Sequence, residues 1–488
     1  MSRTSVAVSA HHAADFGAQR VVTLRIFSGH IHRLGLLAFT EALVVVLALH
    51  AAIFLRFAGA SAPIEAFEAS RGPVWPRAIA ITVVFVLALA SLGLYQLRQR
   101  ARFTGVFVRL LIALGVAHVV LALIFYAAPS LDVGRGVMGL TGGFALIGLA
   151  LTRYIFLRTV DEDFFKRRIL VWGAGARARS IGQRLRRRTD RRGFRIVGYV
   201  RAPGDGGEIP KGPLFRASPG LVRLALRSRI EEIVVAMDDR RSGFPSEALL
   251  ECRLRGIQVS ELLTFLERES GRVSVELMHP GWLIFSSGFR CDFLRLATKR
   301  TFDVVASLGM LIAAAPLALL AALAIHLEDR GPILYRQLRT GQNGRVFRIF
   351  KFRSMRVDAE ADGRAVWASR NDARTTRVGA WIRRLRIDEL PQLVNVLAGH
   401  MSLVGPRPER PEFIADLARG IPFYNERHFV KPGITGWAQV RYGYGASDKD
   451  ALAKLEYDLY YVKHHSFALD LMVLLQTVEI VLFRIGSR

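Results

Sequence analysis

The sequence has 488 residues, which suits two or three folding units better than a single core. Hydrophobic residues make up 51% of it, and 68 lysines and arginines against 41 acidic residues give a formal charge of +27. A chain with such a positive charge is expected to bind an anionic partner: nucleic acid, an anionic membrane or a phosphorylated substrate. The sequence has no zinc-finger, homeodomain or RNA-binding aromatic motif, so no nucleic acid is expected as a partner. Cys252 and Cys291 fit no metal or redox spacing.

The first part of the chain predicts a membrane domain. Residues 1–33 lack the apolar core and cleavage site of a secretory signal, so a cytoplasmic tail is expected there. The apolar runs at 34–57, 78–97, 103–127 and 136–157 are each long enough to cross a membrane as a helix. Basic residues flank the runs so that both ends of this four-helix transmembrane bundle, residues 34–160, are expected in the cytoplasm.

Two charged residues, Glu41 and Arg109, fall inside these runs. Both lie near the predicted cytoplasmic ends of their helices. Snorkelling of the side chain toward the interface is therefore enough to explain them.

Residues 161–290 predict a Rossmann-like α/β domain with a parallel sheet, since apolar strand-like runs alternate with helical stretches. Gly173-Ala-Gly175 follows the first strand and resembles a dinucleotide-binding turn. Ala178 stands at the third glycine position, and Arg201 stands where NAD-binding domains usually have an acidic residue. Two interpretations remain open: a dinucleotide site, or a spacer or regulatory domain that keeps the turn for packing.

A fifth apolar run, at about 299–327, contains Pro316 near its middle. Proline removes an amide donor and clashes with the preceding turn, so a kink or break is expected there. One interpretation is a kinked helix that crosses the membrane. The other is a re-entrant helix that dips in and returns to the same face, which we favour because it keeps residues 331–488 in the cytoplasm.

The region after this helix gathers cations, amides and hydroxyls in short loops, a pattern typical of phosphate binding. Lys351 and Arg353 lie in a Lys-Phe-Arg-Ser-Met string, and Arg383 lies on an amphipathic helix. Arginine forks match phosphate oxygens in a bidentate manner. Farther along, Gly-Pro-Arg-Pro-Glu forms a rigid turn that presents Arg407 and Glu409.

Asp388 and Glu389 are adjacent carboxylates at the end of the Arg-rich helix, just before Pro391. Neighbouring helical residues diverge by about 100°, so the two are poorly placed to share a proton. They can divide the labour: one attacks phosphorus as a nucleophile, and the other holds a divalent cation. Mg²⁺ is the expected ion because it takes one or two carboxylates together with substrate phosphates.

Residues 299–483 resemble the catalytic domain of the bacterial sugar transferases, the monotopic phosphoglycosyl transferases. The matching strings stand in the same order in this chain: Lys299-Arg-Thr-Phe-Asp303, Lys351-Phe-Arg-Ser-Met355, Asp388-Glu-Leu-Pro-Gln392, Gly405-Pro-Arg-Pro-Glu409 and Pro432-Gly-Ile-Thr-Gly-Trp-Ala438. The four preceding helices and the Rossmann-like domain resemble the long form of this family.

The resemblance implies a three-part fold: a membrane α-helical bundle, a Rossmann-like α/β domain, and a mainly α monotopic catalytic domain, residues 291–488, with a re-entrant membrane helix broken at Pro316. It implies that Asp388 is the nucleophile and that Glu389 binds Mg²⁺. Arg383 matches a phosphate-binding arginine. Roles in the nucleotide-sugar pocket are expected for the remaining substrate-binding candidates, Lys351, Arg353, Arg407 and Glu409.

The implied reaction transfers a sugar-1-phosphate from a UDP-sugar, with glucose or galactose as the expected sugar, to polyprenyl (undecaprenyl) phosphate through a phosphosugar-aspartate intermediate. UMP is released, and exopolysaccharide or O-antigen synthesis is initiated. The enzyme is expected in the bacterial inner membrane, in contact with membrane lipid, as a homodimer with its catalytic domain on the cytoplasmic face.

Two other functions are compatible with parts of the sequence. A membrane-tethered nucleotide-sugar dehydratase or epimerase would combine helices with a Rossmann fold, but no tyrosine here has lysine four residues on. A non-catalytic assembly protein would keep the fold and tolerate replacement of Asp388.

Overall fold

The computed structural model describes residues 35–95, 103–159, 166–289 and 292–483, apart from 187, 192, 208–209, 217–219, 242, 279, 358, 360–373, 444 and 446. The expected tail at 1–33 and Cys291 lie outside the described residues. The chain forms two compact units, Met1–Ser270 and Gly271–Arg488.

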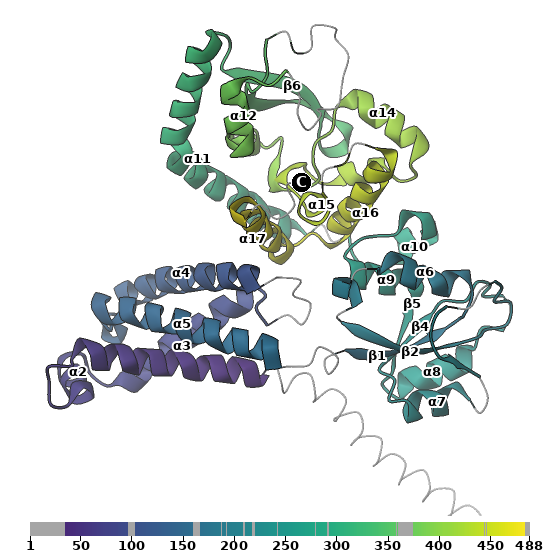
Figure 1. Cartoon of the computed structure of the whole chain (residues 1–488), viewed down its shortest axis with the longest axis horizontal. Helices are drawn as coiled ribbons and strands as arrows, with labels where there is room; N and C mark the ends of the chain where they lie inside the picture. The colour runs from purple at the N-terminus through teal and green to yellow at the C-terminus, as the bar shows by residue number, and fades with distance from the viewer. Residues whose placement is uncertain are drawn as a thin grey trace, which may run out of the picture. The chain divides into compact units, whose positions relative to one another are not determined.

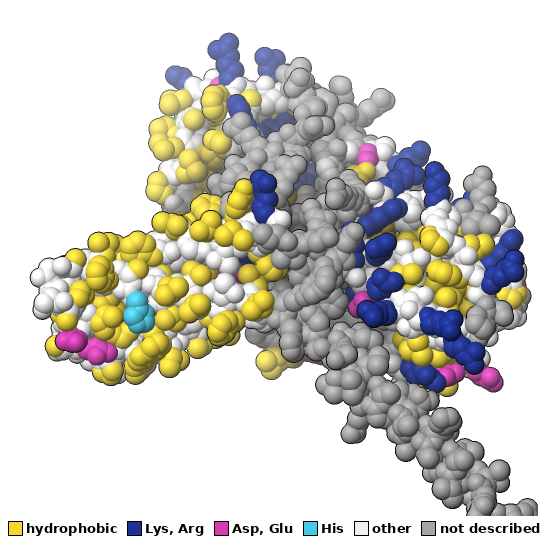
Figure 2. Space-filling view, turned by 60° about the horizontal axis from the view of Figure 1, so that its bottom comes forward, with side chains coloured by type: hydrophobic (Ala, Val, Ile, Leu, Met, Phe, Trp, Pro, Cys, Tyr) yellow, Lys and Arg dark blue, Asp and Glu magenta, His cyan; other side chains and the backbone are white. Residues whose placement is uncertain are grey.

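The predicted membrane helices are present. Their bounds are Gly35–Arg56, Val74–Ser91 (α3), Phe103–Ala127 (α4) and Arg135–Thr159 (α5). The connections contain α2 (Pro63–Arg71) and the 3₁₀ turn η1 (Pro129–Leu131). Helix α3 begins earlier than predicted because Pro76 falls in its first turn, where proline is tolerated. Hydrophobic side chains cover much of the face of the bundle that Figure 2 shows, as a lipid-facing surface requires.

Glu41 does not snorkel. Its side chain is fully buried and pairs with Arg153 of α5, and one contact joins Arg153 Nη2 to Glu41 Oε2 at 3.0 Å. Arg153 also donates to the Leu94 carbonyl at 2.5 Å and lies 5.2 Å from the ring centroid of Tyr95. This single guanidinium therefore joins the first helix, the turn after α3 and α5 inside the bundle.

Replacing Glu41 with methionine is expected to destabilise the bundle by about 3 kcal/mol, because it leaves Arg153 charged, buried and unpaired. Replacing both residues with methionine is expected to recover most of that loss. Thermal unfolding of the purified protein in detergent measures both. A double variant less stable than Glu41→Met would contradict a simple pairing role.

The α/β domain is a five-stranded parallel sheet in the order β3-β2-β1-β4-β5, which confirms the predicted parallel, Rossmann-like sheet. Its strands are β1 (Arg167–Trp172), β2 (Phe194–Val200), β3 (Leu214–Phe215), β4 (Glu232–Val235) and β5 (Gln258–Glu261). Helices α6 (Ala176–Arg184) and α9 (Leu262–Ser270) cover one face of the sheet, and α7 (Leu221–Arg227) and α8 (Ser246–Leu254) cover the other (Figure 1). The 3₁₀ turn η3 (Arg188–Arg191) precedes β2.

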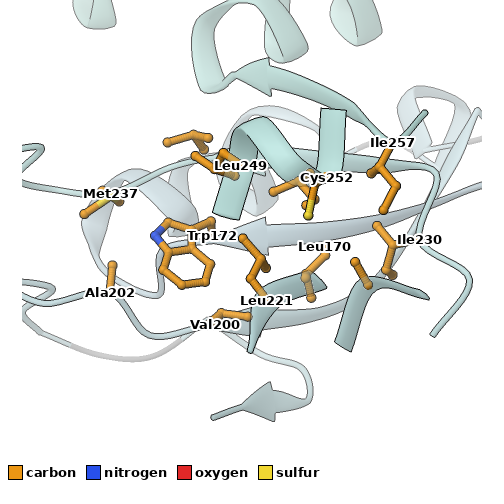
Figure 3. Close-up of a cluster of buried hydrophobic side chains, with 13 residues drawn as sticks. Leu170, Trp172, Val200, Ala202, Leu221, Ile230, Met237, Leu249, Cys252 and Ile257 are labelled. Atoms are coloured by element: carbon orange, nitrogen blue, oxygen red, sulfur yellow. The ribbon is translucent and has the colours of Figure 1, made fainter. Parts of the chain in front are cut away.

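The core of this domain lies between the sheet and the α7–α8 layer. Leu170 and Val200 from the strands meet Leu221 and Leu249 from the helices, and all four are at least 95% buried (Figure 3). The run of buried residues in β1 and β4 is typical of a parallel strand covered on both faces.

The second unit is largely helical, as predicted. Its helices are α10 (Pro280–Phe285), α11 (Phe293–Asp329), α12 (Arg377–Arg384), α13 (Gln392–Leu397), α14 (Pro411–Gly420), α15 (Trp437–Arg441), α16 (Asp448–His464) and α17 (Phe467–Phe483). Two small sheets complete it, antiparallel β6 (Leu334–Thr340) with β7 (Val346–Phe352) and parallel β8 (Ser402–Val404) with β9 (Gly433–Thr435). The 3₁₀ turns are η4 (Val275–Leu277), η5 (Gln342–Gly344), η6 (Ile387–Glu389) and η7 (Asn425–Phe429).

The segment 271–289 packs with this second unit, although the sequence places the domain boundary at 290. Trp437 Nε1 donates to the Gly271 carbonyl at 2.7 Å, and Val273 N donates to the Glu456 carbonyl at 2.9 Å. These contacts join residues far apart in sequence, so hydrophobic pattern alone does not reveal them.

Helix α11 has 37 residues and continues through Pro316 without interruption, so the expected division into two helices is not seen. The helix bends along its length instead (Figure 1). Proline inside a helix removes one hydrogen bond and kinks the axis, and the flanking turns continue the helix on both sides. Large apolar side chains are exposed along its middle, among them Val305, Leu308, Ile312, Leu319, Leu320 and Leu323.

Candidate active site

Asp388 and Glu389 lie in the short turn η6 rather than at the end of the Arg-rich helix. Thr376 caps that helix, α12, by accepting a hydrogen bond from Gly379 N at 2.9 Å, and α12 ends at Arg384. Arg386 then takes a left-handed backbone conformation, with φ of 59°, which turns the chain before the two carboxylates. The acidic pair is thus separated from α12 by a change of chain direction.

A buried asparagine holds this turn against the β6–β7 ribbon. Asn395 of α13 is fully buried, accepts from Phe350 N at 3.0 Å and donates to the Arg348 carbonyl at 2.8 Å. The side chain replaces a missing strand on the outer edge of β7. Because α13 directly follows η6, this bond brings Glu389 next to Lys351 on β7.

Three cations from different segments surround one oxygen of Glu389. Lys351 Nζ lies 3.5 Å from Oε1, Arg407 Nη2 lies 3.3 Å from it, and Arg386 Nη1 lies 3.7 Å from it. Burial by itself raises the pKa of Glu389, but Arg407, Lys351 and Arg386 outweigh it and lower the pKa to about 2. Glu389 is therefore ionised across the physiological range.

Asp388 has the opposite environment. Its Oδ1 atom is buried and has no hydrogen-bond partner among the described residues. Burial raises the pKa of Asp388, and the neighbouring Glu389 raises it further, against the lowering effect of Lys351, Arg386 and Arg383. The site thus holds a carboxylate neutralised by cations beside a carboxylate with an unsatisfied oxygen.

Close contact of two glycine-containing strings places Arg407. Gly405 N donates to the Thr435 carbonyl at 2.9 Å, and Gly433 N donates to the Pro406 carbonyl at 2.9 Å. A Cβ on Gly405 would lie 2.2 Å from the Lys431 carbonyl oxygen, so the two backbones meet where only glycine fits. The loop that follows carries Arg407 to Glu389.

The structure distributes the other predicted substrate-binding residues around this centre. Arg383 donates to Thr375 Oγ1 at 3.1 Å and lies close enough to Asp388 to affect its pKa. Arg353 is buried and pairs with Asp329 at the end of α11. Glu409 lies 3.8 Å from Arg339 Nη1. Lys351 and Arg407 are thus the two that contact the acidic pair directly.

A buried group behind the Arg407 loop was not expected from the sequence. Arg427 donates to the Arg407 carbonyl at 3.1 Å and to Tyr424 Oη at 2.7 Å, and pairs with Asp458 of α16 at 2.7 Å. Burial raises the pKa of Asp458 to about 6, although Arg427 opposes this shift. In the sequence Arg427 is flanked by Glu426 and His428, and nothing there reveals its pairing with Asp458.

Replacing Asn395 with leucine is expected to destabilise the second unit by about 2 kcal/mol, because Phe350 N and the Arg348 carbonyl lose their buried partner. Thermal unfolding of the purified protein measures the loss. Val394→Ala, on an exposed position of the same helix, is the matched control and should change stability much less. Equal effects of the two substitutions would contradict the edge-capping role of Asn395.

These features define a class of protein: a membrane-associated chain in which cations and carboxylates converge next to an exposed apolar helix. The comparisons with known proteins narrow the class. A family model of the bacterial sugar transferases matches residues 294–484, and a CoA-binding domain model matches residues 90–243.

Three relatives have names of the same kind. One is the UDP-glucose:undecaprenyl-phosphate glucose-1-phosphate transferase of Xanthomonas campestris pv. campestris. It is 30% identical to this chain over 433 residues, which cover 84% of this chain and 88% of the relative. An undecaprenyl-phosphate glucose phosphotransferase from Komagataeibacter xylinus is 38% identical, over 64% of this chain and 58% of its own length. An N-acetylgalactosaminephosphotransferase from Aeromonas hydrophila, which is named for UDP-N-acetylgalactosamine and undecaprenyl phosphate, is 42% identical, over 51% of this chain and 58% of its own length.

The chain belongs to the bacterial sugar transferase family. The resemblance drawn from the sequence motifs is thereby confirmed. The chain spans little more than half the length of the Komagataeibacter and Aeromonas relatives, and most of the Xanthomonas relative.

Proposed function

We propose that this protein transfers a sugar-1-phosphate from a UDP-sugar to undecaprenyl phosphate, releases UMP and initiates exopolysaccharide or O-antigen synthesis. One observation carries the proposal: the buried, unpartnered Oδ1 of Asp388 lies beside a carboxylate whose charge three cations offset. A nucleophile with a free oxygen next to a phosphate-binding set of cations is the arrangement that phosphoryl transfer needs.

In the proposed mechanism, Asp388 attacks the β-phosphorus of the UDP-sugar. The bond between that phosphorus and the bridging oxygen breaks, UMP leaves with the electron pair, and the phosphosugar is bound to Asp388. The phosphate of undecaprenyl phosphate then attacks the same phosphorus, forms a lipid diphosphate sugar and frees Asp388. Lys351, Arg383 and Arg407 offset the charge that builds on the phosphoryl oxygens.

We propose that Glu389 holds Mg²⁺ during this reaction, while Asp388 attacks phosphorus. The described residues contain no cluster of three or more His, Cys, Asp or Glu that could hold a metal alone, so phosphate oxygens and water would complete the coordination around Glu389. When bound, the ion supplies charge neutralisation at the phosphates.

Replacing Asp388 with asparagine is expected to reduce UMP release by more than about 10³-fold, a barrier increase of about 4 kcal/mol, because the nucleophile is lost. The assay measures UMP from purified enzyme with Mg²⁺, undecaprenyl phosphate and a UDP-sugar. Asp416→Asn, the same change on an exposed part of α14, is the control and should retain activity. Full UMP release by Asp388→Asn would contradict Asp388 as the nucleophile, and no UMP release by the wild type from any UDP-sugar would support a non-catalytic assembly role.

The donor sugar is proposed to be a hexose, with UDP-glucose the first to test. Two of the relatives above are named for glucose and one for N-acetylgalactosamine. A panel of UDP-glucose, UDP-galactose and UDP-N-acetylgalactosamine in the same assay distinguishes them. A nucleotide-sugar dehydratase or epimerase would convert the donor without releasing UMP.

We propose that α11 is re-entrant and that the catalytic unit lies on the cytoplasmic face of the inner membrane. Contacts at both ends of the helix support this. Near its start, Lys299 lies 2.6 Å from Asp470 of α17, and Arg300 donates to the Val396 carbonyl of α13 at 2.6 Å. Near its end, Asp329 pairs with Arg353 after β7. Both ends thus belong to one unit, while the exposed apolar middle is available to lipid.

Membrane-impermeant maleimide labelling tests re-entry. In a background with both native cysteines replaced, Phe293→Cys and Arg330→Cys are expected to react from the same, cytoplasmic, side, because both positions border the catalytic unit. Inside-out vesicles and intact spheroplasts give the two sides. Reaction of the two positions from opposite sides would indicate a crossing helix and contradict the proposal.

A homodimer remains part of the proposal, with the α/β domain as the contact surface. Its helix α8 exposes Leu250 and Leu254, which are 59% and 80% accessible. Mass photometry in nanodiscs, compared with a variant carrying serine at both positions, tests this assignment.

A further inference from the structure

The match to a CoA-binding domain raises the question of what the glycine turn of the α/β domain binds. CoA and dinucleotides carry a pyrophosphate, which Rossmann domains place against free amides of the glycine turn and the first helix N-terminus. The corresponding segment here is 173–177, between β1 and α6. Ligands of such sheets bind at the carboxyl ends of the strands.

Two amides of this segment already donate to a carboxylate of the protein. Asp238, which follows β4, accepts from Ala176 N at 2.9 Å through Oδ2 and from Arg177 N at 2.8 Å through Oδ1. These are the first amides of α6, which have no partner within the helix and which a phosphate would use. The carboxylate provides the negative charge that the helix N-terminus favours.

A second carboxylate accepts from another amide of this segment. Asp205, in the loop after β2, is buried and accepts from Ala174 N at 2.7 Å and from Ala202 N at 2.8 Å. Its other oxygen accepts from Asp238 N at 3.2 Å, which fixes the backbone of the first carboxylate. Three amides of the segment, at 174, 176 and 177, are thus satisfied by two strand-end aspartates.

The glycines fit the protein's own groups rather than an incoming ligand. A Cβ on Gly175 would lie 2.0 Å from Asp238 Oδ2, and a Cβ on Gly173 would lie 2.3 Å from the Ala236 carbonyl oxygen. Both glycines are therefore required by the close approach of the chain after β4. A pyrophosphate in the same position would meet two carboxylates, and like charges at such distances repel strongly.

We infer that Asp238 replaces the ligand phosphate in this fold, so that the α/β domain takes neither CoA nor a dinucleotide at its glycine turn and acts as a closed structural domain. Arg201, at the end of β2, is consistent with this: its Nη2 lies 3.4 Å from the Asp205 carbonyl oxygen, within the same group. The inference does not depend on the reaction proposed for the catalytic unit.

Hydrogen–deuterium exchange of the full-length protein in detergent tests the inference at the amides themselves. In the wild type, amides 176 and 177 are expected to be protected, and CoA, NAD⁺ or pyrophosphate at millimolar concentration should leave their exchange unchanged. In Asp238→Ala the same amides should exchange roughly tenfold faster or more, because a hydrogen bond to a charged group is lost. Added pyrophosphate should restore protection, since the variant presents a vacant anion site.

Asp239→Ala, which removes the same charge one residue later, is the matched control and should change neither the exchange nor its response to pyrophosphate. If Asp238→Ala does not fold, Asp238→Asn keeps one acceptor and removes the charge, and should show a smaller increase in the same direction. Saturable binding of CoA or NAD⁺ by the wild type, measured by calorimetry, would overturn the inference. So would unchanged exchange in both Asp238 variants.

Discussion

Neutralisation of Glu389 is the interaction on which the catalytic unit depends. Its Oε1 receives Lys351 from β7, Arg386 from the turn before η6 and Arg407 from the loop after β8. A buried carboxylate without these partners would carry a large desolvation cost. The same contacts bring three segments of the chain together. The ion pairs that neutralise Glu389 therefore also assemble the site.

The environment of the neighbouring Asp388 follows from this arrangement. Because the cations gather on Glu389, Asp388 keeps a buried oxygen without a partner among the described residues. An unsatisfied polar atom in a folded protein has a cost, and such costs are typical of functional sites. Other buried groups serve to hold the shape: Asn395 fixes the turn to β7, and Arg427 fixes the backbone at Arg407.

The sequence was sufficient for features that local pattern determines. Long apolar runs predicted the membrane helices, alternation of strands and helices predicted the parallel sheet, and Asp388-Glu389 among arginines predicted a cluster of carboxylates and cations. It was insufficient where distant segments meet. The Glu41–Arg153 pair, the Arg427–Asp458 pair and the packing of 271–289 with the catalytic unit each depend on tertiary contacts across long separations. Pro316 was expected to divide its helix, but the hydrogen-bonded turns on both sides keep α11 continuous.

Detection of the covalent intermediate tests the central claim most directly. Purified enzyme is incubated with Mg²⁺ and a UDP-sugar in the absence of undecaprenyl phosphate, digested, and analysed by mass spectrometry. The account predicts a phosphosugar adduct on the peptide that contains Asp388, which disappears when undecaprenyl phosphate is added. Formation of the lipid-linked product by an enzyme that never carries the adduct would show direct transfer between the two substrates and contradict the account.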